Sequence, residues 1–181
     1  MPKKVGSDTG EFHSRLAEHV PHGKWYEGVV KSGLAQFPLS RLSMVLRLKF
    51  PPTPENASRH ALVAVESVRN IEGVELDYSP QSLVALDGII EKLRQDGATL
   101  EQIAETLFTF GCYVGEVFVR HAGGFWRAEE ETPMRGLAGF MVVELPGTKF
   151  CNPIGKTFKR LRDGATENLP YFYAQFAESV L

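Results

Sequence analysis

The stretch that decides the fold runs from residue 99 to residue 124 and reads TLEQIAETLFTFGCYVGEVFVRHAGG. Thr99 and Gln102 form a capping box, in which each side chain bonds the backbone N–H of the other residue at the start of a helix. Apolar residues then recur at helical spacing on one side: Leu100, Ile103, Ala104, Leu107, Val114 and Phe118. Two glycines end the pattern. The sequence therefore predicts a long amphipathic helix over residues 99–122, against which the other elements pack.

Two strands are expected after this helix, over residues 125–130 and 138–145. A turn that contains Pro133 and Gly136 joins them, because both residue types favour changes of chain direction. An earlier strand is expected over residues 43–50, where apolar and charged side chains alternate with the period of two that marks a half-buried strand.

Helices are expected around these strands. Ser79-Pro80 and Asn152-Pro153 each place a capping residue before a proline, an arrangement that suits the first turn of a helix. The expected helices, in chain order, cover residues 11–20, 53–73, 79–97 and 152–162, with a last one that opens at residue 168. Strands that cluster, instead of alternating with helices, favour an α+β fold with several amphipathic helices packed on a small, mainly antiparallel sheet.

The composition is that of an ordinary globular protein. The 181 residues suffice for a single domain over residues 1–181, of which residues 1–10 are expected to fray. A net charge of −2 gives no overall field for nucleic acid, and no apolar run reaches the ~18 residues of a membrane span. Two cysteines are too few for a disulfide framework, and no secretory signal is present, so a cytoplasmic location is expected.

Gly155-Lys156-Thr157 matches the end of a phosphate-binding loop, but the rest of that motif is missing. The loop needs a glycine five residues before the Gly-Lys pair, and Phe150 occupies that position. The sequence therefore predicts neither nucleotide binding nor a cofactor.

Two charged groups are candidate partner-binding surfaces. Lys156, Lys159 and Arg160 share one side of an amphipathic helix, which is typical of a solvated face but also suits an acidic partner. The other group is acidic and consists of Glu129, Glu130 and Glu131 at a strand end. These carboxylates suit a basic partner surface, or they simply protect an edge strand from pairing with another chain.

Glu116 and Arg120 are spaced as an ion pair along the long helix. Their apolar neighbours predict that the pair is partly covered and reaches Trp126 or Arg127 on the next strand. With His121 and Cys151 they form the alternative site, a pocket between the long helix and the strands. Cys151 precedes a helix start, where the helix dipole favours a thiolate.

Three further patterns have simple interpretations. Gly111 and Gly115 are four residues apart, which permits the close approach of another element to the long helix. Cys112 lies beside the apolar side of that helix and is expected in the core. Near the N-terminus, three histidines offer zinc ligands without completing a familiar motif: His13, His19 and His22.

Three runs of sequence resemble the core of small bacterial domains of unknown function. They are LDYSPQSLVALDGIIEKLR (76–94), FGCYVGEVFVRHAGGFW (110–126) and CNPIGKTFKRLRDG (151–164), so the resemblance covers residues 76–164. The residues that carry it are Tyr113, Gly115, Glu116, Val117, Gly124, Trp126, Asn152 and Pro153. Some such domains are similar to the proteins that guard bacteria against their own polymorphic toxins, which implies protein binding and no catalysis.

The sequence favours a non-enzymatic protein that binds one protein partner through charged and aromatic side chains. The residues expected at that interface are Glu129, Glu130, Glu131, Trp126, Lys156, Lys159 and Arg160. The alternatives are a small-ligand or enzymatic site at the pocket described above and a metal site at the N-terminal histidines. The sequence leaves the partner and the oligomeric state open.

Overall fold

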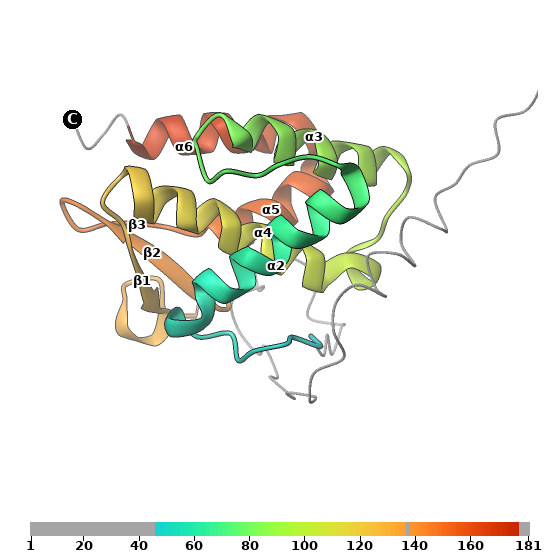
Figure 1. Ribbon diagram of the computed structural model, residues 1–181. Coiled ribbons are helices and arrows are strands. Elements are labelled where there is room, and N and C mark those ends of the chain that lie inside the picture. The colour runs from blue at the N-terminus through green and yellow to red at the C-terminus, as the bar shows by residue number, and fades with distance from the viewer. Residues whose placement is uncertain (1–45, 137, 178–181) are drawn as a thin grey trace, which may run out of the picture.

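A computed structural model describes residues 46–136 and 138–177. Within these residues five α-helices pack with a three-stranded antiparallel sheet, which confirms the predicted α+β class (Figure 1). In chain order the elements are η2 (Pro54–Asn56), α2 (Ala57–Glu72), α3 (Ser82–Gln95), α4 (Leu100–His121), β1 (Phe125–Ala128), η3 (Glu129–Glu131), β2 (Met141–Leu145), β3 (Lys149–Cys151), α5 (Pro153–Asp163), η4 (Gly164–Glu167) and α6 (Leu169–Ala177). None of the described helices is both long and apolar enough to cross a membrane.

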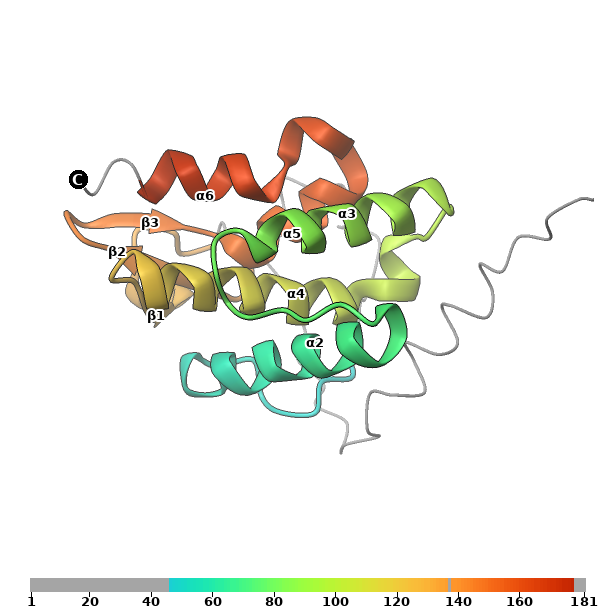
Figure 2. The same cartoon turned by 45° about the horizontal axis from the view of Figure 1, so that its top comes forward.

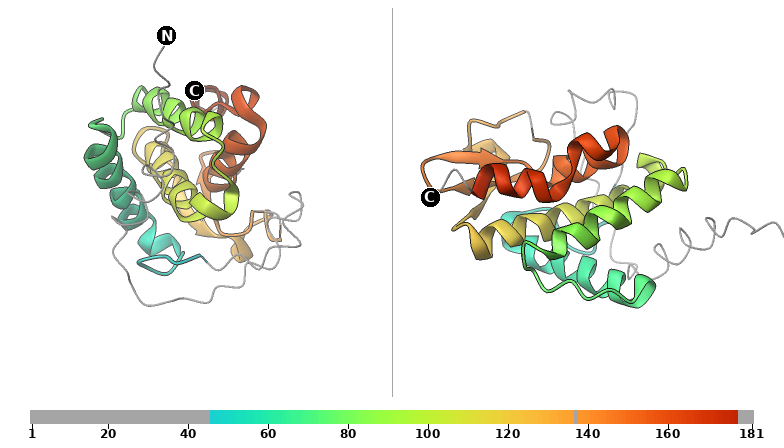
Figure 3. Two further views of the ribbon diagram at one scale, coloured as in Figure 1. Left: turned by 90° about the vertical axis from the view of Figure 1, so that its right-hand side faces the viewer. Right: turned by 90° about the horizontal axis from the view of Figure 1, so that it is seen from above.

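Helix α4 is the centre of the domain, and the other helices surround it when it is viewed along its length (Figure 3). The predicted capping box is present, with the Thr99 backbone N–H donating to Gln102 Oε1 at 2.9 Å. The helix ends before Gly123, which adopts a positive φ of 66°. Every residue from Leu107 to Phe118 is buried, so the helix is covered on all sides and not only along the predicted apolar side.

Two glycines let neighbouring elements reach the backbone of α4. A Cβ on Gly111 would overlap the backbone and side chain of Ile154 in α5, and a Cβ on Gly115 would overlap the ring of Trp126 in β1. The predicted close approach is confirmed at both positions. These two contacts fix where α5 and the sheet lie along α4.

The sheet has the order β1-β2-β3, and its first two strands are shorter than the sequence predicted. In its register, Trp126 faces Val143, which in turn faces Cys151. The strand expected over residues 125–130 ends at Ala128, and the strand expected over 138–145 begins only at Met141. Strand β3 was not predicted, because three residues are too few for a visible alternation.

The strand expected over residues 43–50 is not formed in its described part, residues 46–50. The alternation itself is real, since Leu46 and Leu48 are buried while Arg47 and Lys49 are exposed. The segment lies on helices, and the backbone N–H of Arg47 donates to the Glu105 carboxylate at 2.8 Å instead of to another strand. A period of two shows that a segment is extended, but it does not show that a neighbouring strand exists.

Helices α5 and α6 have the asparagine caps that the sequence predicted, whereas α2 and α3 begin later than expected, at Ala57 and Ser82, with no side-chain hydrogen bond from their N-cap residues. Asn152 accepts a hydrogen bond from the Gly155 backbone N–H at 2.7 Å, and Asn168 accepts one from Tyr171 at 2.8 Å. Helix α2 ends at Gly73, whose φ is 66°. Between α2 and α3 the chain crosses over α4 as an extended segment (Figure 2). The helix expected over residues 11–20 lies outside the described residues.

His60 ties the start of the described chain to the core. Its side chain is buried between the rings of Phe50 and Phe108, whose centroids lie 5.7 and 5.0 Å from the imidazole. Its Nε2 lies 3.2 Å from the carbonyl oxygen of Pro51, so this nitrogen is the donor of the neutral ring. Burial lowers the pKa of His60 from its ordinary value of 6.5, and the charge of Arg59 acts in the same direction.

The two glycines Gly111 and Gly88 should respond in opposite ways to alanine. Gly111→Ala should lower the free energy of unfolding by about 2 kcal/mol, because the new methyl group meets Ile154 backbone that cannot rotate away. Gly88→Ala, in α3, meets nothing within 4 Å and should raise it by up to ~1 kcal/mol through helix propensity. Urea unfolding of both variants measures this, and equal stabilisation of the two would contradict the close packing.

The stability of the domain should depend on pH through His60. Below pH 6.5 the unfolded chain takes up a proton that the buried imidazole resists, so the free energy of unfolding falls as the pH decreases. The loss is complete once the pH is below the folded-state pKa, and it is absent above 6.5. Urea titrations between about pH 5 and pH 8 should show this slope in the parent and a flatter one in His60→Gln. An unchanged slope in His60→Gln would rule out this origin.

Candidate protein-binding surface

The C-terminal half of α4 holds a buried carboxylate with two partners. Glu116 Oε1 accepts a hydrogen bond from Trp126 Nε1 at 3.0 Å, and Oε2 lies 3.6 Å from Arg120 Nε. Glu116 is buried, whereas the Arg120 side chain is 45% exposed. The predicted covering of this pair and its contact with Trp126 are confirmed. One carboxylate thus connects the helix, the sheet and an outward-facing guanidinium.

Tyr78 lies between this pair and the segment that joins α2 to α3. Its ring stacks on Tyr113 with centroids 4.8 Å apart, and the Arg120 guanidinium covers it at 3.5 Å from the centroid. His121 Nε2 lies 3.0 Å from the Tyr78 carbonyl oxygen, which makes this nitrogen the donor. The φ of Tyr78 is 63°, a left-handed conformation that is rare for an aromatic residue and persists only where surrounding contacts hold it.

A chain of hydrogen bonds supplies part of that restraint. The Tyr78 backbone N–H donates to the Tyr113 hydroxyl oxygen at 2.8 Å. Ser82 Oγ lies 2.5 Å from the same hydroxyl and 2.6 Å from the Ser79 carbonyl, to which it donates. The Tyr113 hydroxyl must therefore donate to Ser82. Burial raises the pKa of Tyr113, so the hydroxyl keeps the proton that this direction requires.

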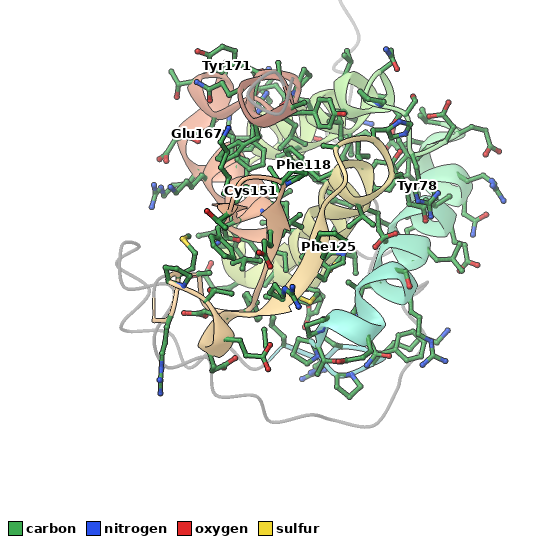
Figure 4. The ribbon with its side chains drawn as sticks, turned by 90° about the vertical axis from the view of Figure 1, so that its left-hand side faces the viewer. Tyr78, Phe118, Phe125, Cys151, Glu167 and Tyr171 are labelled. Atoms are coloured by element: carbon green, nitrogen blue, oxygen red, sulfur yellow. The ribbon has the colours of Figure 1, made fainter. Side chains whose placement is uncertain are left out.

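Two exposed apolar residues lie at the same end of the molecule as this cluster. Phe125 is 59% exposed, because β1 turns Trp126 toward the helix and its neighbour outward. Pro146, in the β2–β3 turn, lies beside Gly123 and is exposed. We call Tyr78, Arg120, His121, Phe125 and Pro146 the α4-end surface. Figure 4 views the end of the molecule that carries Tyr78 and Phe125.

The predicted alternative pocket comes together only in part. Glu116, Arg120 and His121 all reach Tyr78 or its neighbours, but Cys151 lies on β3, on the other side of Phe118 from Tyr78 in Figure 4. Burial raises the pKa of the Cys151 thiol, so it stays protonated at neutral pH. The expected thiolate at the start of α5 is therefore not supported.

Both cysteine side chains are buried. Cys112 lies in the core, as predicted, and burial followed by the charge of Glu116 raises the pKa of its thiol. In the described part of the chain, no three or more His, Cys, Asp or Glu side chains gather as a metal site would require. The histidines His13, His19 and His22 lie outside the described residues.

The predicted acidic surface needs a correction at Glu129. This residue is buried, and its carboxylate accepts hydrogen bonds from the backbone N–H groups of Ala138 and Gly139 at 3.3 and 2.6 Å. It closes the loop between β1 and β2 and is not available to a partner. Glu130 and Glu131 are exposed, as expected.

The predicted basic strip needs a larger correction, because Arg160 is buried. Its guanidinium bonds both oxygens of Asp87 at 2.9 and 3.0 Å and one oxygen of Glu91 at 2.6 Å. Lys156 is largely covered as well and pairs with Glu167 at 2.6 Å. Within the described residues, Lys159 is the member of the strip that remains partly exposed and forms no salt bridge.

The Arg160 network joins α3, α5 and the start of α6. Asp87 also accepts a hydrogen bond from the Leu169 backbone N–H at 2.9 Å. Hydrogen bonds from Arg94 and then from Arg160 hold the pKa of Glu91 well below its usual range. The group is therefore a structural connection between helices.

Comparison with known proteins identifies a family whose function is unknown. The model of a family of unknown function, DUF6278, matches residues 60–178, which is more than half of the chain. The chain belongs to the DUF6278 family. Comparison with curated proteins and with solved structures gave no significant match. The resemblance predicted from the sequence is thus confirmed as to the kind of family, and it extends beyond residues 76–164 on both sides.

Three members of the α4-end surface in this DUF6278 chain, Tyr78, Phe125 and Pro146, were not predicted from the sequence. Tyr78 stands in a linking segment, and its unusual backbone leaves no signal in the residue type. Trp126 was expected to be exposed, whereas Phe125 is the exposed aromatic residue. Gly115 was the available signal, because a glycine that faces a strand leaves room for a large ring.

Arg160 should contribute strongly to stability, in contrast to its neighbour Lys159. Arg160→Leu should lower the free energy of unfolding by about 3 kcal/mol, since it removes both guanidinium hydrogen bonds of the Asp87 carboxylate and one from Glu91 and leaves a buried network partly unsatisfied. Lys159→Leu should change it by no more than about 0.5 kcal/mol. Chemical denaturation of both variants provides the comparison. Similar effects at the two positions would mean that the basic strip is a solvated face after all.

Proposed function

We propose that this DUF6278 domain is a non-enzymatic protein that binds one protein partner through the α4-end surface. The observation that carries the proposal is the presence of a strongly exposed aromatic side chain and of a fixed, exposed arginine at one end of the domain. Phe125 projects from a paired strand, and Arg120, near the end of α4, stacks on Tyr78. Large exposed aromatic residues and arginine are enriched among the residues that dominate protein–protein binding energies.

The rigidity of this surface supports a binding role. Association costs about 0.5–1.5 kcal/mol for each flexible side chain that becomes ordered. Arg120 is already restrained by Tyr78 and Glu116, and Tyr78 by Tyr113 and His121. Much of this cost is therefore met when the domain folds, which leaves more of the contact energy for affinity.

The exposed charges away from this surface suit a different role. Glu130 and Glu131 are exposed, and Lys159 is partly exposed. Such peripheral charges mainly change association rates and salt dependence. We therefore assign them to steering of the partner rather than to the main contact.

The finer form of the proposal is a bacterial, cytoplasmic protein of the toxin-immunity type. Its support is the resemblance of the Tyr-x-Gly-Glu-Val and Gly-Gly-x-Trp segments to small bacterial domains, together with the shape of a single compact domain. The reading frames next to the gene provide a direct check. A large toxin-like neighbour supports this form, and a metabolic operon contradicts it.

A small-ligand or enzymatic role for Glu116, Arg120, His121 and Cys151 has less support. The Glu116 carboxylate already has Trp126 and Arg120 as partners, and the nitrogen of His121 that faces Tyr78 is engaged. Cys151 is buried elsewhere as a protonated thiol. No group in this set is thereby free to act as a nucleophile.

Photocrosslinking in the host cell tests the proposed surface. A photoreactive benzoylphenylalanine replaces Phe125 in one variant and Val84, on α3, in a matched control. Both side chains are strongly exposed, at 59% and 64%, so both variants should fold. Position 125 should give one discrete adduct with a protein, and position 84 should give none.

The partner found in this way then allows a quantitative measurement. Phe125→Ser should weaken its binding to the domain about tenfold or more, whereas Val84→Ser should leave the affinity unchanged. Adducts of equal yield at both positions, or no adduct at position 125, would refute the α4-end surface.

A further inference from the structure

Some guanidinium N–H groups of Arg120, on the α4-end surface, have no acceptor among the described residues. Its Nε lies 3.6 Å from Glu116 Oε2, which is too long for a hydrogen bond. Apart from the Tyr78 side chain, no described residue is placed to accept a hydrogen bond from its two terminal nitrogens. A guanidinium carries five N–H donors in a planar fork, and 45% of this side chain is exposed.

The surroundings hold this fork in one orientation. Stacking on the Tyr78 ring fixes the plane of the guanidinium, and Tyr113 supports the ring from its other face. Glu116 cannot turn out to meet the terminal nitrogens, because it is buried and held by Trp126. A stacked guanidinium binds other groups through its edge, where two parallel N–H donors match the two oxygens of a carboxylate.

Nearby acidic side chains work against the attraction of an anionic partner to Arg120 over long distances. Asp77 is exposed, but its carboxylate accepts a hydrogen bond from the Ser79 backbone N–H at 2.9 Å. Glu66 lies on α2, close enough for its charge to raise the pKa of Tyr78. These acids oppose long-range attraction of an anion. Selection by Arg120 must therefore come from direct contact and not from steering.

Apolar side chains are exposed at the same end of the domain. Phe125 and Pro146 are both exposed, and the Pro146 ring lies next to Gly123, two residues after His121. A partner that contacted Arg120 alone would leave Phe125 uncovered. The surface therefore offers a cationic and an apolar contact.

Resting on the proposed function, we infer that Arg120 binds the side-chain carboxylate of an Asp or Glu residue of the partner protein. The carboxylate meets the edge of the guanidinium in a two-point contact. Apolar side chains of the partner pack on Phe125 and Pro146. Glu116 and Tyr113 act as positioning residues, because Glu116 restrains the guanidinium and Tyr113 holds Tyr78 beneath it.

Capped dipeptides test this inference without knowledge of the partner. The probes are N-acetyl-Glu-Leu-amide, N-acetyl-Gln-Leu-amide and N-acetyl-Gln-Leu with a free terminal carboxylate. Binding is followed by the NMR signals of Arg120 Nε–H and of the Trp126 indole N–H, which reports on the same carboxylate. The Glu probe should shift both signals saturably and bind about tenfold more tightly than the Gln amide probe.

Two substitutions provide the controls. Arg120→Gln should reduce binding of the Glu probe, followed by the Trp126 signal, to that of the Gln amide probe. Arg69→Gln, at an arginine that is 53% exposed and paired with Glu75, should have no effect. Equal binding of the Glu and Gln amide probes would overturn the inference, and so would a preference for the free terminal carboxylate or a lack of any shift. None of these results changes the crosslinking test at Phe125, so the two proposals fail separately.

Discussion

The close approach of Trp126 to the backbone of α4 at Gly115 is the contact on which the rest of this domain depends. The ring occupies the space that any side chain at position 115 would need, and its N–H bonds Glu116 one residue further along. At Gly111, Ile154 makes the equivalent approach from α5. These two glycines, four residues apart on the same side of the central helix, therefore fix α5 and the sheet about one turn apart along it, and both positions are set to within the size of a methyl group.

The residues that carry the resemblance to small bacterial domains serve this packing, whereas other residues nearby face solvent. Tyr113 accepts a hydrogen bond from the backbone of Tyr78, and Gly115 makes room for the ring of Trp126. At Gly124 a Cβ would overlap the side chain of Val143. The pattern Tyr-x-Gly-Glu-Val with Gly-Gly-x-Trp is thus explained by packing and hydrogen bonding alone. The groups offered to a partner, Arg120 and Phe125, lie between these positions and are oriented by them. A packing motif can accordingly identify the domain while saying little about what it binds.

Local signals in the sequence predicted most of the helices, whereas contacts between distant segments could not be predicted. The capping box at Thr99 and the Asn152 cap depend on neighbouring residues and were found. Arg160 was expected to be exposed, because a helical wheel shows which residues share a face but not that α3 will bring Asp87 and Glu91 over that face. The alternation of β1 placed its two aromatic residues on opposite faces, but which face meets α4 depends on Gly115, eleven residues away from Trp126.

A double-mutant cycle between Gly115 and Trp126 tests the central contact most directly. The free energy of unfolding is measured for Gly115→Ala, for Trp126→Leu and for the two combined. If the ring occupies the place of the missing side chain, alanine at position 115 is strongly destabilising with tryptophan present and much less so with leucine. The coupling energy should then exceed about 1 kcal/mol. Additive effects of the two substitutions would show that Trp126 does not seat on α4 in this way.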